Sequence, residues 1–241
     1  MKSTNKSERT SPFMKIVIVI FAAILVITLM LPSLSALFAP KNEGKAAPQS
    51  EETSQTVETE PKAPESAQDV DKIFQPAADA LKKKLDDKPD NVALLNDLSG
   101  LYFNWGVQLM PYAKDDATLG HMQQVFLSAN EHYDKLLSIS PSDSVTIDKN
   151  LALFYAGKKE EALKGLQDLT KKSPDFAPAW ANLGMVYEAE NQTDDAKRAY
   201  KKALEVNKDE QSQVKLYAES RLAALDKQSE TSSSAEATGT K

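Results

Sequence analysis

The chain has 241 residues, and its 35 acidic against 29 basic residues give a formal charge of −6 at pH 7. An acidic chain is a poor match for a phosphate backbone, so we expect no nucleic acid among its partners. The sequence contains no cysteine, which excludes disulfides, zinc–thiolate sites, a thiol nucleophile and the lipid-bearing cysteine of a lipoprotein.

Residues 16–38 form a run of 23 residues without a charge. As a helix with a rise of about 1.5 Å per residue, the run would be about 34 Å long, enough to cross a hydrocarbon core of about 30 Å. Residues 1–15 carry four basic side chains, whereas the twenty residues after Pro40 carry five glutamates and two lysines. This asymmetry predicts a signal-anchor helix in a cell membrane, with a cytoplasmic N-terminus and an extracytoplasmic remainder.

A cleaved secretory signal is the alternative interpretation of this segment. Small residues from Ser33 to Ala36 lie near a potential cleavage point, and Pro32 could end the apolar helix. The run is longer than the roughly 7–15 apolar residues of such a signal, however, and Pro40 would hinder cleavage after Ala39. Under either interpretation the rest of the chain is exported.

Two segments lack the residues that build a core. Residues 41–68 are dominated by Ala, Pro, Ser, Thr, Glu, Gln and Lys, and residues 227–241 form a Ser/Thr/Glu/Ala tail. Both segments are predicted to be disordered. As a flexible coil, the linker over 41–68 would have an r.m.s. span of roughly 30 Å, so it would hold the following domain near the membrane.

Between Val70 and Leu225 the apolar residues recur at spacings of three and four, without the alternation that strands require. This pattern predicts an all-α domain over residues 70–226. The expected helices are 70–87, 92–110, 117–138, 145–155, 159–171, 177–190, 194–206 and 210–226.

A period of about 34 residues runs through this domain, and it is typical of stacked helical hairpins. Small, large and helix-ending residues recur together in Ala129, Tyr133, Leu136 and Pro141, in Ala162, Leu166, Leu169 and Pro174, and in Ala196, Tyr200, Ala203 and Lys208. Trp180, Leu183, Gly184 and Tyr187 precede the last set. In these positions the chain resembles the tetratricopeptide-repeat (TPR) family, and its organisation is similar to that of bacterial membrane-anchored TPR proteins.

The resemblance implies a TPR-type helical-hairpin solenoid of about three repeats, at about 92–141, 143–176 and 177–210, with flanking cap helices. The second repeat departs from the family pattern, because Lys149 and Asn150 stand where the family has Leu and Gly. The first repeat carries about 18 extra residues between its halves, and lengthened helices would accommodate them.

The resemblance also implies a peptide-binding groove along the first helix of each repeat. Carried over by position, its lining is Asn96, Phe103, Asn104, Phe154, Tyr155, Ala181, Asn182, Met185 and Glu188. Aromatic, amide and methionine side chains suit an extended or helical peptide. These positions hold no Lys or Arg, which argues against a ligand carboxylate and favours a neutral or basic, partly apolar segment. Phe103, Phe154 and Tyr155 could instead be core residues between hairpins.

The sequence predicts no catalytic site, metal or cofactor. His121 and His132 would lie about 16 Å apart along one helix, too far to share a metal ion. The paired carboxylates, such as Asp115–Asp116 and Glu160–Glu161, fall at helix ends, where acidic side chains favour the helix dipole or solvate. Gly-rich phosphate loops and nucleophile motifs are missing from the sequence.

We therefore expect a non-catalytic, membrane-tethered and exported scaffold or chaperone-like adaptor that binds another protein. The alternative is a self-associating structural protein of the cell envelope. Its interface would be the aromatic-rich segment from Tyr102 to Tyr112, which could equally fill the lengthened first hairpin.

Overall fold

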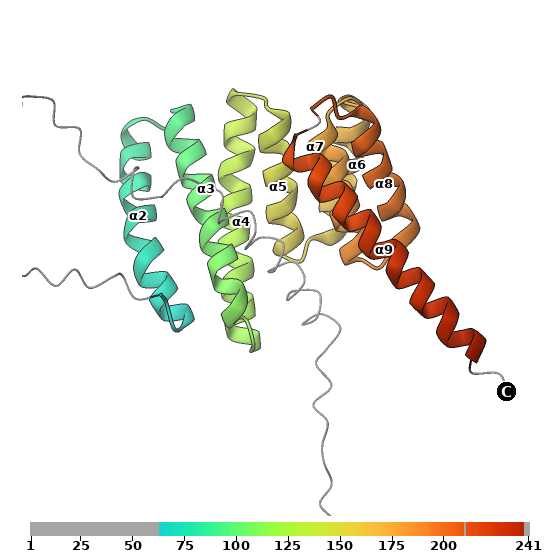
Figure 1. Ribbon diagram of the computed structural model, residues 1–241. Coiled ribbons are helices and arrows are strands. Elements are labelled where there is room, and N and C mark those ends of the chain that lie inside the picture. The colour runs from blue at the N-terminus through green and yellow to red at the C-terminus, as the bar shows by residue number, and fades with distance from the viewer. Residues whose placement is uncertain (1–62, 210, 239–241) are drawn as a thin grey trace, which may run out of the picture. The chain divides into compact units, whose positions relative to one another are not determined.

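A computed structural model describes residues 63–209 and 211–238. In those ranges the chain forms eight α-helices, one short 3-10 helix and no strand, which confirms the predicted all-α class (Figure 1). The elements are α2 (Ala67–Asp87), α3 (Val92–Leu109), η2 (Met110–Tyr112), α4 (Asp116–Ile139), α5 (Asp143–Tyr155), α6 (Lys159–Lys172), α7 (Ala177–Ala189), α8 (Thr193–Val206) and α9 (Gln213–Thr238).

The predicted membrane segment is not part of this description. The cytoplasmic N-terminus (1–15), the transmembrane helix (16–38) and nearly all of the linker (41–68) lie outside the described residues. Within the described part of the chain, no helix has both the length and the apolar character needed to cross a membrane.

Five helices begin at a side chain that caps them. Ser66, Asn91, Asp115, Ser142 and Ser212 each accept a hydrogen bond from the backbone N–H three residues on, at 3.2, 3.0, 2.8, 3.4 and 3.2 Å. The capping oxygen satisfies one of the N–H groups that the first helical turn leaves without a partner. The cap at Ser66 explains why α2 begins at Ala67, inside the predicted linker.

The last helix, α9, is longer than predicted. It continues to Thr238, whereas residues 227–241 are predicted to be disordered. No glycine or proline interrupts the sequence between Gln213 and Gly239, so the helix meets no backbone obstacle until the residue after Thr238.

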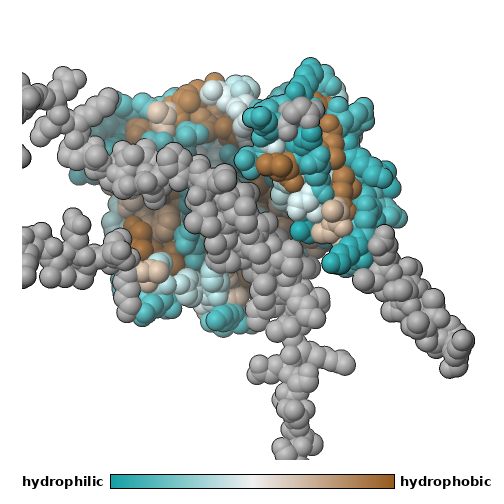
Figure 2. All heavy atoms as spheres, in the orientation of Figure 1, coloured by the Kyte–Doolittle hydropathy of each residue, from teal (hydrophilic) through white to brown (hydrophobic). Residues whose placement is uncertain are grey.

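The helices pack as three successive hairpins, α3–α4, α5–α6 and α7–α8. Helix α5 also contacts α7, and α7 contacts α9, so the first helices of the hairpins lie side by side with α9 as the last member of their layer. Helix α2 covers α3 at the other end of the row (Figure 1). On the face seen in Figure 2, hydrophobic residues lie in separate patches within a largely hydrophilic surface.

Each hairpin is closed by a small residue against a larger one. A Cβ atom on Gly184 of α7 would lie 2.7 Å from the Tyr200 ring of α8, so only glycine allows this approach. In the second hairpin the positions are exchanged, because Asn150 of α5 is the larger partner and Gly165 of α6 the small one. This exchange explains why Asn150 can stand where the family has glycine.

The lengthened first hairpin is filled by α2. Its helices have 18 and 24 residues, compared with 13 and 14 in the two later hairpins. Trp105 is 2% exposed, stacks against Phe74 of α2 with ring centroids 6.2 Å apart, and donates from Nε1 to Asp71 at 2.8 Å. Tyr102 and Met110 are also buried. These three residues of the aromatic segment are therefore core and are not available to an interface, whereas Phe103 and Asn104 of the same segment keep accessible surface.

Tyr112 fixes the start of the cover helix. Its hydroxyl donates to the backbone oxygen of Pro64 at 2.5 Å, just before the cap at Ser66. Tyr112, at the end of the first hairpin where α3 meets α4, thus contacts the residues that precede α2.

Candidate peptide-binding groove

Two predicted groove residues meet across the layer of first helices. Phe103 of α3 and Tyr155 of α5 are both half-buried, and their rings lie 6.1 Å apart in an edge-to-face arrangement. Both rings rest on Phe126 of α4, at 5.6 and 5.2 Å, and Phe126 is fully buried. Phe103 and Tyr155, which we call the aromatic pair, therefore pack on a common buried ring while each residue keeps some surface accessible to solvent. Burial raises the pKa of the Tyr155 hydroxyl.

Two other predicted groove residues belong to the core. Phe154 is 8% exposed and packs among Leu153, Leu166 and other core residues of α5 to α8. Ala181 is 4% exposed and lies in the cluster of Ala196 and Tyr200. Both side chains are buried, Phe154 among residues of the second and third hairpins and Ala181 against α8 and α9, so neither offers open surface to a ligand. For Phe154 this agrees with the alternative core interpretation.

Four further predicted groove residues, three asparagines and one methionine, lie along α3 and α7. Asn96 and Asn104 are exposed on α3. Asn182 is half-buried and donates from Nδ2 to the backbone oxygen of Pro178 at 2.8 Å. Met185 is half-buried and packs against the core of the second and third hairpins, so each of these residues keeps some surface open.

Glu188 is already occupied by the last helix. It accepts hydrogen bonds from the Tyr200 hydroxyl at 2.9 Å, from Arg221 Nε at 3.1 Å and from Arg221 Nη2. The hydrogen bonds from Arg221 to Glu188 raise the pKa of the Arg221 guanidinium. Glu188 thus fastens α9 to α7 and is not an open contact for a ligand.

Arg221 was missed by the sequence reasoning. The sequence of residues 210–226 predicts an apolar cap helix. No local pattern indicates that Arg221, 33 residues after Glu188, pairs with that carboxylate. A pairing at nearly one repeat length is the signal that could have suggested it, because equivalent positions of adjacent repeats come close together.

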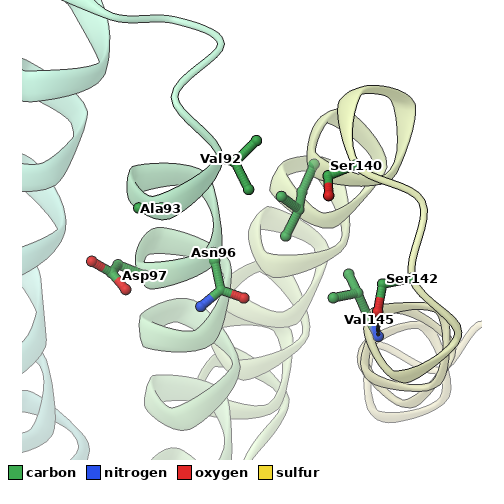
Figure 3. Close-up of a pocket in the computed structure, with 8 residues that line it drawn as sticks. Val92, Ala93, Asn96, Asp97, Ser140, Ser142 and Val145 are labelled. Carbon is green, nitrogen blue, oxygen red and sulfur yellow. Dashed lines mark hydrogen bonds between the residues drawn. The ribbon is translucent and has the colours of Figure 1, made fainter.

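A pocket lies at the end of the groove where α3 and α5 begin and α4 ends. Its cavity volume is about 540 Å³, and it is lined by Val92, Ala93, Asn96, Asp97, Leu136, Ser140, Ser142 and Val145 (Figure 3). In Figure 3 the Asn96 amide extends between α3 and α5 with Val145 opposite, whereas the Asp97 carboxylate points to the other side of α3. We call this cavity the α3–α5 pocket.

One helical turn below the pocket lies a carboxyl that the sequence reasoning also missed. Asp148 follows the pocket residue Val145 by three positions, and burial raises its pKa to about 6. The neighbouring cation, Lys149, forms its ion pair with Asp134 instead. An alignment of the second and third repeats could have identified Asp148. It pairs Lys149–Asn150 with Leu183–Gly184, and Asp148 then takes the position of the predicted groove residue Asn182.

Tyr133 of α4 lies beside Asp148. Burial, assisted by the Asp148 carboxylate and opposed by the Ser99 hydroxyl of α3, raises the pKa of Tyr133. Ser99, Tyr133 and Asp148 each lie one turn from a pocket residue, namely Asn96, Leu136 and Val145. Ser99, Tyr133 and Asp148 therefore form one group beside the α3–α5 pocket, with Tyr133 between the other two.

The two histidines have separate surroundings on α4. His121 Nε2 lies 2.9 Å from Asp71 Oδ1, and His132 stacks on Tyr102 with ring centroids 5.5 Å apart. Burial lowers the pKa of His132. Among the residues that the structure describes, no group of three or more potential ligands could hold a metal ion.

Comparison with solved structures finds several similar chains. A MamA structure designated MSR-1 C2 is 18% identical, with a TM-score of 0.41 over 56% of this chain and 67% of that one. MamA from Desulfovibrio magneticus RS-1 is 17% identical, with a TM-score of 0.37 over 67% of this chain and 86% of that one. YrrB, described as a TPR protein with an unusual peptide-binding site, is 15% identical, with a TM-score of 0.34 over 64% and 88%.

Comparison with curated proteins finds no match. Among protein families, the tetratricopeptide repeat matches residues 177–210, which are the hairpin of α7 and α8 with the turn that follows. The same hairpin holds the Gly184–Tyr200 approach, and two further hairpins precede it in the stack. Residues 177–210 therefore form one tetratricopeptide repeat, at the end of a stack of three helical hairpins.

Proposed function

We propose that this protein is a non-catalytic scaffold or adaptor that binds a peptide segment of another protein in the groove over α3, α5 and α7. The observation that carries the proposal is the aromatic pair. Rings from two successive first helices meet there on the buried Phe126, and both residues keep some surface accessible to solvent. Rigid aromatic surface of this kind gives a ligand contact area at a low cost in conformational entropy.

The proposal includes a location. The charge asymmetry around residues 16–38 supports a membrane anchor with the TPR domain on the extracytoplasmic side. A flexible linker between anchor and groove would raise the local concentration of the groove near membrane-associated partners. The self-associating alternative has less support, because two aromatic residues of its proposed interface, Tyr102 and Trp105, are buried under α2.

Site-specific photocrosslinking in cells tests the groove. A photoreactive residue at Asn104, which is exposed next to Phe103, should capture a discrete partner, and Tyr155→Ala should abolish the product while the protein remains folded and exported. The matched control is a photoreactive residue at Lys164, exposed on the second-layer helix α6. Crosslinking to the same partner from Lys164 but not from Asn104 would refute the groove as the binding site.

The absence of cysteine permits a clean test of topology. Single cysteines introduced at Ser3 and, separately, at Lys164 should react differently with a membrane-impermeant maleimide on intact cells. We expect labelling at position 164 and protection at position 3 until the cells are lysed. Labelling at position 3 together with protection at 164 would reverse the proposed orientation, and loss of position 3 from the mature chain would indicate cleavage.

A further inference from the structure

The groove carries a negative charge that the protein itself does not neutralise. Asp148 is half-buried, and none of the hydrogen bonds or ion pairs among the described residues reaches its carboxyl group. The cations nearest in sequence or across the pocket are engaged elsewhere, because Lys149 pairs with Asp134 and Lys135 pairs with Asp90 at 3.3 Å. Burying a carboxyl without a partner is unfavourable.

The surroundings of Asp148 fit a long basic side chain. The α3–α5 pocket one turn above it offers Val92, Leu136 and Val145 as apolar walls, and its volume is about 540 Å³. Lysine and arginine side chains combine an apolar stem with a charged head, so they can line such walls and still place their charge beside a carboxylate. The Asn96 amide at the mouth of the pocket is placed to contact a peptide backbone (Figure 3).

The distance to the aromatic pair sets a spacing for the ligand. Asp148 and Tyr155 lie on one face of α5, seven residues apart, which corresponds to about 10 Å along the helix. On α3, Asn96 and Phe103 have the same separation. An extended peptide advances about 3.3 Å per residue, so residues three apart in the ligand match this interval.

We propose that the groove recognises an extended peptide in which a lysine or arginine enters the α3–α5 pocket to pair with Asp148, while an apolar residue three positions away packs on the aromatic pair. This inference rests on the proposed function and adds the chemistry of the ligand to it. The partner is thus a protein with an exposed basic and apolar segment.

The test is a display selection of random dodecapeptides on the full chain, purified in detergent. The wild-type protein should enrich peptides that carry Lys or Arg three residues from an aromatic or large aliphatic residue. Asp148→Asn should remove the basic preference and keep the apolar one. For one selected peptide, the Kd measured by fluorescence polarisation should rise about tenfold in Asp148→Asn. It should change less than about twofold in Asp168→Asn, whose carboxyl lies on α6 away from the groove.

The outcomes separate the two proposals. Enrichment of apolar peptides without basic residues, or with acidic ones, would overturn the role of Asp148 and leave the groove as the binding site. Enrichment that persists unchanged in a Phe103→Ala/Tyr155→Ala variant, or no enrichment at all, would overturn the groove itself and this inference with it. Circular dichroism of each variant at 222 nm shows that the helices are retained.

Discussion

Replacing Asp148 with asparagine should make the protein more stable at neutral pH. The carboxyl has a pKa of about 6 in the folded protein, against the ordinary value of 3.8. Between these two pH values the folded state binds more protons at this site than the unfolded state. The stability of the wild type therefore falls as pH rises from about 4 to about 6, and the full cost is present above that window.

The magnitude follows from the two pKa values. Their difference corresponds to about 3 kcal/mol for a carboxyl whose folded environment shields it fully from water. Asp148 is half-buried and keeps some contact with solvent, so we expect Asp148→Asn to add about 2 kcal/mol at pH 7.5. In a domain of this size that gain raises Tm by about 4–8 °C. At pH 4 the two proteins should differ little, because the wild-type carboxyl is then protonated.

Urea unfolding at pH 4 and pH 7.5, followed by circular dichroism at 222 nm, measures this difference. Asp168→Asn is the matched control, since Asp168 is exposed and its hydrogen bonds to Lys164 and Lys171 lower its pKa, which reverses the sign of the expected effect. Equal gains for Asp148→Asn at both pH values would refute the electrostatic argument. A loss of stability at pH 7.5 would show that Asp148 has a partner in the folded protein.

Three further substitutions test the packing. Arg221→Met leaves the half-buried Glu188 without its guanidinium partner, so we expect the free energy of unfolding to fall by about 1–3 kcal/mol and hydrogen exchange in α9 to become faster. Arg198→Met, on the exposed face of α8, is the control. Unchanged protection of α9 would contradict the role of Arg221 in holding α9 to α7. Gly165→Ala should lower the free energy of unfolding by about 1–3 kcal/mol, because the new Cβ overlaps Asn150. In a double-mutant cycle, Asn150→Gly should relieve this loss. Gly120→Ala is the control, since its Cβ would meet open space and alanine should stabilise α4. Asp71→Ala removes the acceptor of the Trp105 indole and should expose the N-terminal turns of α2 to limited proteolysis. Asp79→Ala on the same helix should not do so, and equal cleavage of both variants would refute the anchoring role of Asp71.

The sequence predicts the helices well because their signals are local. The spacing of apolar residues and the caps Asn91, Asp115 and Ser142 define most helix bounds to within a few residues. The exception is α9, whose Ser- and Thr-rich end reads as a disordered tail although no glycine or proline ends the helix before Gly239. Composition alone does not distinguish a polar helix from a coil when no apolar face is required.

The groove is predicted less well because its residues depend on contacts between repeats. Phe103 and Tyr155 contact each other and are only partly buried, whereas Phe154 is core. Adjacent residues of a helix point about 100° apart, so a small rotation of one hairpin exchanges a groove side chain for a core one. Asp148 escaped notice because the second repeat lacks the family's Leu and Gly, which would have fixed the position of its first helix.

The exchanged pair in the second hairpin makes positions 150 and 165 interdependent. With Asn150 present, a Cβ atom at position 165 would overlap the amide. Asn150 also donates from Nδ2 to the Thr146 backbone oxygen at 2.7 Å, so a smaller residue at 150 removes a hydrogen bond as well as volume. A side chain at 165 therefore fits only in a sequence that also has a smaller residue at 150, and the two positions have to be designed together.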